Sequence, residues 1–150
     1  MTHRNNLNPA DLNLLNEWRR YQSTLSLILC VAVRELFPRA RVRIEHSTSK
    51  GFYCTVDHQL TAEDVRKIEA QMKQFVSENL PIQRMNFPKK KASYLFKNLD
   101  QLDKVRLLKH IHKENIIVYS LLDFYDIYAI PPFDTTQQAP LFYLKNFPPG

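Results

Sequence analysis

The chain has 150 residues, of which 44% are hydrophobic and 24% are charged, so it can form one domain with a substantial buried core. The formal net charge of +6 permits an anionic partner, although an excess of this size is also common on domains that bind none. The sequence contains no run of about 18 uncharged apolar residues and no signal peptide. We therefore expect a cytoplasmic protein without a membrane partner.

The segment from Asn8 to Pro38 has the apolar spacing of a helix with one buried face. Asn8 can cap free backbone N–H groups, Pro9 fits the first helical position, and Pro38 cannot continue a helix. Between residues 23 and 33 the apolar stripe widens until few polar residues interrupt it. We therefore expect a central helix that other elements surround. Its apolar positions are Leu12, Leu15, Trp18, Leu25, Ile28, Leu29, Ala32, Val33 and Leu36.

A hairpin is predicted after this helix. Val42 and Ile44 alternate with charged residues in segment 40–46, which is the period of a half-buried strand. Residues 47–51 then form a turn, and a second strand returns over residues 52–56.

The next segment predicts an amphipathic helix. Thr61 stands three residues before Asp64, a close relative of the capping box, and the helix should end near Asn79, which tolerates the left-handed conformation. The apolar stripe between these ends consists of Val65, Ile68, Met72, Phe75 and Val76.

The second half of the chain predicts short helices and strands. A helix beginning at Pro88 carries Lys89, Lys90 and Lys91 in its first turn, where the helix dipole disfavours cations. Either these lysines form a solvated basic turn or they contact an anion or nucleic acid. A second short helix is expected at 101–110, and the predicted strands are 81–87, 116–122, 124–130 and 141–147, with a loop at 131–140.

This order of elements implies an α+β fold, with a long central helix wrapped by a mostly antiparallel sheet and further helices outside. We expect a single domain over residues 1–150. It would comprise a flexible start at 1–8, the central helix at 9–38, and the sheet and outer helices at 39–150.

Two familiar kinds of site are excluded or disfavoured by residue content. Phosphate-binding loops and dinucleotide fingerprints need several glycines, but Gly51 and Gly150 are the only two in the chain. His110 and His112 are a weak candidate for a metal site, because flanking lysines disfavour a cation there. Cys30 and Cys54 are widely spaced in apolar stretches, which favours two buried free thiols.

The remaining candidates for acid–base chemistry are scattered. His46 is expected at the end of a strand beside serines and Lys50, where either a polar site or a hydrogen-bonded turn histidine would fit. Asp123, Tyr125 and Asp126 lie in an aromatic strand with no histidine near in sequence. These residues alone indicate a basic α+β domain and identify no particular activity.

Several runs of residues occur in the same order as in one known domain. Residues 43–54 (RIEHSTSKGFYC) and 60–65 (LTAEDV) are followed by 79–82 (NLPI) and by Lys104 with Val105. From about Trp18 to Gly150 the chain resembles the second N-terminal domain of threonyl-tRNA synthetases, which is shared more distantly with alanyl-tRNA synthetases.

In the synthetases the resembled domain removes wrongly attached amino acids from tRNA, using a His-x-x-x-His pair and a Cys-x-x-x-His pair. The resemblance places Ser23 and Leu27 at the first pair, and Tyr128 and Pro132 at the second. Leucine and proline can neither bind a metal nor move a proton, so editing by this route is not expected. Two lesser positions of that site, Lys104 and Asp126, are retained.

A second branch of the family is also similar. Some bacterial uridine or nucleoside kinases carry this domain ahead of a kinase domain, and they too lack the editing histidines. Residues 124–128 (FYDIY) and 143–150 (YLKNFPPG) resemble those proteins, whereas the stretch from Tyr128 to Pro132 lacks their glycine. The resemblance implies a C-terminal kinase domain as a partner, with ATP and Mg²⁺ as cofactors only if such a domain follows.

Three functions follow as hypotheses. The first is a non-catalytic accessory, regulatory or ligand-binding domain, with a nucleoside as one possible ligand. The second is a free-standing RNA or aminoacyl-tRNA binding module, and the third is a residual hydrolase that uses His46 with Asp126. The candidate cleft for a ligand comprises Ser23, Leu27, His46, Lys50, Tyr53, Lys104, Asp126 and Tyr128. The candidate nucleic-acid contacts are Arg19, Arg20, Arg41, Arg43, Lys89, Lys90 and Lys91.

Overall fold

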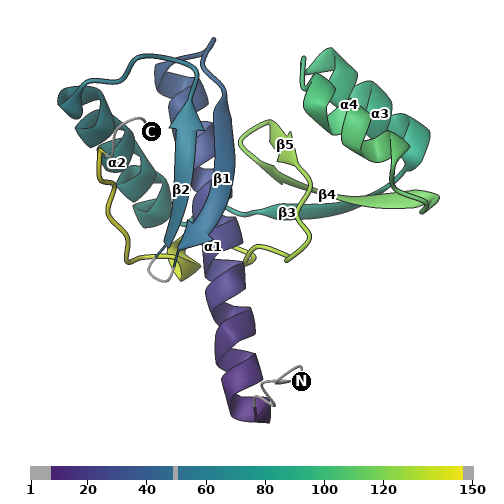
Figure 1. Ribbon diagram of the computed structural model, residues 1–150, viewed down its shortest axis with the longest axis horizontal. Helices are drawn as coiled ribbons and strands as arrows, with labels where there is room; N and C mark the ends of the chain where they lie inside the picture. The colour runs from purple at the N-terminus through teal and green to yellow at the C-terminus, as the bar shows by residue number, and fades with distance from the viewer. Residues whose placement is uncertain (1–7, 49–50, 147–150) are drawn as a thin grey trace, which may run out of the picture.

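The computed structural model describes residues 8–48 and 51–146, without the side chains of 46–48. Apart from Asn8, the predicted flexible start therefore lies outside the described residues. Figure 1 shows α1 running from the bottom of the view toward the top, with β1, β2 and α2 around its upper part and the other strands and helices to one side. The elements in chain order are α1 (Pro9–Leu36), β1 (Val42–Thr48), β2 (Gly51–Val56), α2 (Ala62–Ser77), β3 (Gln83–Pro88), α3 (Lys89–Asn98), α4 (Leu102–Lys109), β4 (Asn115–Leu121), β5 (Phe124–Asp126) and the 3-10 helix η1 (Thr136–Gln138).

The long helix α1 begins and ends where the sequence predicts. The Asn8 side chain accepts a hydrogen bond from the Asp11 backbone N–H at 2.9 Å, which satisfies a free donor of the first turn. At the other end the Phe37 N–H donates to the Val33 carbonyl at 2.7 Å. The C-terminal half of α1 contacts α2, β1, β4 and η1, as expected for a surrounded helix. The N-terminal half projects beyond these elements (Figure 1).

The predicted hairpin is confirmed, with one correction. Strands β1 and β2 pair antiparallel, and the ladder is interrupted by a bulge between Ile44 and His46. Ile44, predicted to be half-buried, is 41% exposed, whereas Val42 packs against the core. The bulge follows Ile44, so Val42 and Ile44 lie on the same face of the strand, and the period of two is broken only after Ile44.

Helix α2 has the predicted caps. The Thr61 hydroxyl accepts from the Asp64 N–H at 3.1 Å, and the Asp64 carboxylate accepts from the Thr61 N–H at 2.9 Å. Asn79 has a φ of 50°, so it takes the left-handed conformation expected after the helix. Four of the five predicted apolar residues are buried, namely Ile68, Met72, Phe75 and Val76.

The second sheet has the order β3-β4-β5, and both pairings are antiparallel. Leu122 and Asp123 join β4 to β5 with φ values of 47° and 63°, the geometry of a tight two-residue hairpin turn. Arg34 at the end of α1 donates to both of their carbonyls. The predicted strand 124–130 stops at Asp126, because the Asp126 carboxylate accepts the Ile127 N–H within the chain.

The structure is α+β, and its strand pairs are antiparallel, as predicted. The described strands form a two-stranded and a three-stranded sheet instead of one sheet wrapped around α1. The buried side chains likewise form two clusters. One surrounds α1 and α2, and the other lies between α3, α4 and β4 and is centred on Phe96.

The lysines at the start of α3 have structural contacts that the sequence did not reveal. Lys89 donates to the Ile111 carbonyl, and the Lys91 ammonium lies 4.5 Å from the centre of the Phe87 ring. These contacts offset the unfavourable position of the two cations near the helix N-terminus. Lys90 is exposed.

The C-terminal strand predicted at 141–147 is wrong over residues 141–146, which form no helix or strand, and Phe147 lies outside the described residues. Side chains take the backbone bonds that a neighbouring strand would need. The Tyr21 hydroxyl donates to the Leu141 carbonyl at 2.8 Å and accepts its N–H, and Glu69 accepts the Leu144 N–H at 2.9 Å.

In the described parts of the chain, no helix is long and apolar enough to cross a membrane.

Candidate functional site

The middle turn of α1 carries the first two candidate residues. Ser23 is half-buried, and Leu27 is 0% exposed within the core cluster around α1. The start of β2 reaches this turn, because the Gln22 amide donates to the Gly51 carbonyl at 3.1 Å. The Leu27 position therefore belongs to the packed interior and is closed to a substrate.

Tyr128 lies just after β5 and packs against the same cluster, edge-on to Tyr119 with ring centres 6.2 Å apart. Its hydroxyl is buried and has no hydrogen-bond partner among the described residues. Burial, and then the negative charge of Asp126, raise the pKa of Tyr128 well above its usual value. The phenol therefore stays neutral at physiological pH.

Lys104 and Asp126 form an ion pair at 2.8 Å that joins α4 to β5. Their side chains are only 24% and 9% exposed. Burial disfavours the Lys104 charge, but the attraction and hydrogen bond of Asp126, with help from Asp103, outweigh it and raise the pKa of Lys104. Because the Asp126 carboxylate also accepts the Ile127 N–H at 2.7 Å, both of its charge-stabilising contacts are internal.

Cys30 lies on α1 about one turn after Leu27, close enough to Asp126 and Lys104 to interact with their charges. Burial, and then the charge of Asp126, raise the pKa of the Cys30 thiol far above its usual value. Burial also raises the pKa of Cys54 on β2. Both cysteines are free, as predicted, although each residue is half-buried instead of fully buried. Protonated thiols are poor nucleophiles and poor metal ligands.

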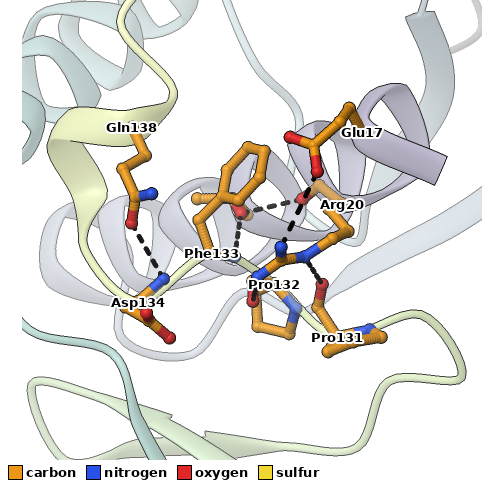
Figure 2. Close-up of polar contacts among 8 residues, drawn as sticks. Glu17, Arg20, Pro131, Pro132, Phe133, Asp134 and Gln138 are labelled. Carbon is orange, nitrogen blue, oxygen red and sulfur yellow. Dashed lines mark hydrogen bonds and ion pairs between the residues drawn. The ribbon is translucent and has the colours of Figure 1, made fainter. Parts of the chain in front are cut away.

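The loop after Tyr128 is anchored on the two turns of α1 that precede Leu27 (Figure 2). Arg20 donates to the carbonyls of Pro131 and Pro132, each at 3.3 Å, and lies 4.7 Å from the centre of the Phe133 ring. The buried Thr24 hydroxyl accepts the Phe133 N–H at 2.8 Å. These contacts place Pro132 beside Arg20 and Thr24, on the face of α1 that also carries Ser23 and Leu27.

The rest of this loop is fixed by side chains that bond to the backbone. Gln138 accepts the Asp134 N–H at 3.0 Å, as Figure 2 shows, and the Thr136 hydroxyl donates to the Phe75 carbonyl at 2.6 Å. Thr136 thus holds the loop against α2, while Gln138 bonds to the backbone within the loop.

The remaining cleft candidates are only partly placed. The backbone of His46 pairs with Tyr53 across the hairpin, and Tyr53 is half-buried. The side chain of His46 and the whole of Lys50 lie outside the described part of the structure. Whether His46 meets Asp126 therefore stays a prediction, and Asp126 itself is already paired with Lys104.

The predicted nucleic-acid contacts lie on three separate elements or just beside them. Arg19 and Arg20 are on α1, Arg43 is on β1 and Arg41 just precedes it, and the three lysines are on α3. Several have intramolecular partners: Arg20 holds the loop, Arg41 pairs with Asp100, and Lys89 and Lys91 contact their neighbours. Arg19, Arg43 and Lys90 are exposed.

Among the described cleft residues, Lys104 and Asp126 are paired with each other, and Tyr128 and Cys30 have raised pKa values. Over residues 8–48 and 51–146, no set of three or more histidine, cysteine, aspartate or glutamate residues could hold a metal ion. His110 and His112 are both exposed. Sequence reasoning missed the roles of Arg20, Thr24 and Cys30. The only available signal was that Cys30 follows Ser23 and Leu27 at helical spacing.

No protein-family model matches the chain. The chain is 33% identical over 129 residues to the threonine–tRNA ligase of Clostridioides difficile, a match that covers 84% of this chain and 20% of that protein. It is 32% identical over 147 residues to the enzyme of Acetivibrio thermocellus, covering 93% of this chain and 23% of the enzyme. It is 35% identical over 121 residues to the enzyme of Thermotoga maritima, a match that covers 77% of this chain and 19% of that enzyme. The chain thus corresponds over most of its length to about a fifth of these ligases.

Proposed function

We propose that this chain is a non-catalytic binding or regulatory module related to the editing-type domain of threonyl-tRNA synthetases. The observation that carries the proposal is Leu27, which is 0% exposed at a position where the resembled domain has a histidine. An aliphatic side chain sealed in the core cannot activate water. The proposal keeps the scaffold of the synthetase relatives and assigns this chain no hydrolytic step.

The surviving polar residues support the same conclusion. Lys104 and Asp126 bind each other at 2.8 Å, so neither presents a free charge to a substrate. Tyr128 and Cys30 both have raised pKa values and stay protonated beside them. A general base must accept a proton near neutral pH, and none of these described groups is poised to do so.

A deacylation assay tests this proposal. Purified chain is incubated with mischarged tRNA, with a histidine-containing synthetase editing domain as the positive control. We expect release of the amino acid at the spontaneous rate. Hydrolysis above that rate that disappears in both Lys104→Met and His46→Ala variants would overturn the proposal.

The kinase context is a finer proposal that rests on the sequence resemblance of residues 124–128 and 143–150. In this version the module regulates, or binds a ligand for, a nucleoside-kinase-like domain that would use ATP and Mg²⁺. The gene should then encode a glycine-rich phosphate-binding loop after the codon for Gly150. A stop codon at that point would remove this version and leave the non-catalytic module intact.

RNA binding is the second candidate function, favoured by the net charge of +6 and by the exposed Arg19, Arg43 and Lys90. Phosphate contacts release counterions, so tRNA affinity should fall steeply as salt rises. Filter binding of tRNA that carries no amino acid, between about 50 and 200 mM salt, measures how steeply the affinity falls. Absence of binding at the lowest salt would exclude the RNA-binding candidate.

A further inference from the structure

A cavity of about 530 Å³ lies between α1, β2, α2 and the segment 144–146. Its walls are mainly aliphatic and come from elements far apart in the sequence. The aliphatic residues are Leu29, Val33, Val56, Leu60, Val65, Ile68 and Leu144, and the polar ones include Asp57, His58, Gln59, Lys145 and Asn146. None of the candidate cleft residues Ser23, Leu27, Lys104, Asp126 and Tyr128 lines it.

The size and walls of the cavity fit a small molecule with an apolar body. Ligand pockets in proteins typically measure about 300 to 1,000 Å³ and are lined mainly by hydrophobic side chains with a few polar groups. Burying an apolar group here would remove both the ligand and the exposed parts of Val56, Leu60 and Val65 from water.

The polar rim indicates which charge the ligand carries. Asp57 is the acidic side chain that lines the cavity, and its carboxylate accepts the Arg41 N–H. The charge of Asp57 is therefore stabilised by the protein backbone and does not require a cationic ligand. By contrast Lys145 lines the cavity, is exposed, and makes no ion pair or side-chain hydrogen bond within the described residues. His58 stands beside it on the rim, with its ring 4.7 Å from that of Phe37.

We propose that this cavity binds a small amphipathic anion, with the apolar body between α1 and α2 and one carboxylate or sulfonate group at Lys145. The site shares no residue with the candidate cleft, so it does not depend on the absence of editing activity. It gives the non-catalytic module a ligand of defined chemistry.

The probe for this site is 8-anilinonaphthalene-1-sulfonate, which combines two apolar ring systems with one sulfonate. The ¹⁵N-labelled chain is titrated with up to about 1 mM probe while amide shifts are recorded. We expect saturable one-to-one binding, with the largest shifts at residues 56–60, 65 and 144–146. No saturable shift would overturn the proposal, and so would a maximum at the exposed Leu12, Leu14 and Trp18 of α1.

Two substitutions separate the apolar and charged parts of the site. Val65→Phe fills the cavity and should weaken the probe about tenfold or more, whereas Val105→Phe, a half-buried valine in the other cluster, should leave the affinity unchanged. Lys145→Gln should weaken the probe about two- to fivefold, because an exposed ion pair contributes modestly. Lys113→Gln, at an exposed lysine outside the cavity, is its control.

The uncharged relative N-phenyl-1-naphthylamine tests the role of the charge, because it has the same rings without the sulfonate. It should bind the wild type and Lys145→Gln equally well, while Val65→Phe still weakens it. Lys145 is on the exposed rim, so its variant should retain the wild-type amide spectrum and the comparison remains interpretable. If Lys145→Gln weakens both probes equally, the charge assignment is wrong.

Discussion

The two halves of α1 have the same helical spacing of apolar residues but different surroundings. In the N-terminal half Leu12 and Leu14 are 45% and 70% exposed, and this half projects from the molecule in Figure 1. In the C-terminal half Leu27 and Ile28 are 0% exposed, because α2, β1, β4 and η1 surround them. Periodicity therefore establishes the helix, while the neighbours decide which part of it contributes to the core.

The boundary between the halves is set by the anchored loop. Arg20 and Thr24 hold residues 131–133 against α1. Trp18 lies about one helical turn before Tyr21 and stacks on it, with ring centres 6.1 Å apart. Tyr21 in turn holds Leu141 through its hydroxyl. Beyond these contacts toward the N-terminus, α1 has few described neighbours to stabilise it, and its stability depends more on its own cap and first turn.

The largest contrast is expected between two leucine truncations. Leu27→Ala should lower the free energy of unfolding by about 3 kcal/mol, because it leaves a cavity in a fully buried site. Leu14→Ala, at a 70% exposed position, should change it by less than about 0.5 kcal/mol. Urea unfolding followed by circular dichroism measures both. Equal losses would mean that the N-terminal half is packed as tightly as the C-terminal half.

Breaking the ion pair beside the C-terminal half should have the next largest effect. Lys104→Met leaves Asp126 without its cation in a site where its side chain is 9% exposed. We expect a loss of about 1 to 2 kcal/mol, less than for a fully buried pair because Lys104 is 24% exposed. Lys109→Met, at an exposed lysine of the same helix, is the control. The double variant with Asp126→Asn should recover part of the loss, and a simple sum of the two single losses would contradict the coupling.

Alkaline pH should destabilise the same region through Cys30. The pKa of this thiol is raised in the folded protein, so above about pH 9 the unfolded chain releases a proton that the folded chain keeps. Stability is then full below the unfolded pKa and falls by about 1.4 kcal/mol per pH unit above it. Cys30→Ala should remove this part of the slope between about pH 9 and 10 in urea titrations. An unchanged slope would show that the thiol reaches solvent in the folded state.

Sequence signals predicted helix ends well where residues next to each other in the chain make the capping contacts. Asn8, Thr61 and Asn79 occupy the cap positions expected from their side-chain chemistry. The predicted strand is absent over residues 141–146, where Tyr21 and Glu69, both far away in sequence, take the backbone bonds of Leu141 and Leu144. The division into two sheets and the bulge in β1 are also tertiary features that no local pattern encodes.

The candidate site was predictable in part for a similar reason. The resemblance gave Leu27, Tyr128 and Pro132, and the loop contacts in Figure 2 explain how Pro132 comes to lie on α1. The contribution of Cys30 and the anchoring role of Arg20 were not predicted. Arg20 appears in the sequence as a surface cation, and only the folded chain brings the carbonyls of residues 131 and 132 within its reach.

The smallest expected effect is the most informative about the projecting half of α1. Asn8→Ala removes an N-cap bond that is ordinarily worth about 1 kcal/mol, but fraying of this half exposes few core contacts. The global free energy of unfolding should therefore fall by less than about 0.3 kcal/mol, while the amides of residues 12–18 exchange faster with deuterium. Thr61→Ala is the matched control, because α2 buries its apolar stripe and should lose the full cap value of about 1 kcal/mol. If both variants lose the same global stability, the projecting half unfolds together with the core, and the division of α1 into two halves is wrong.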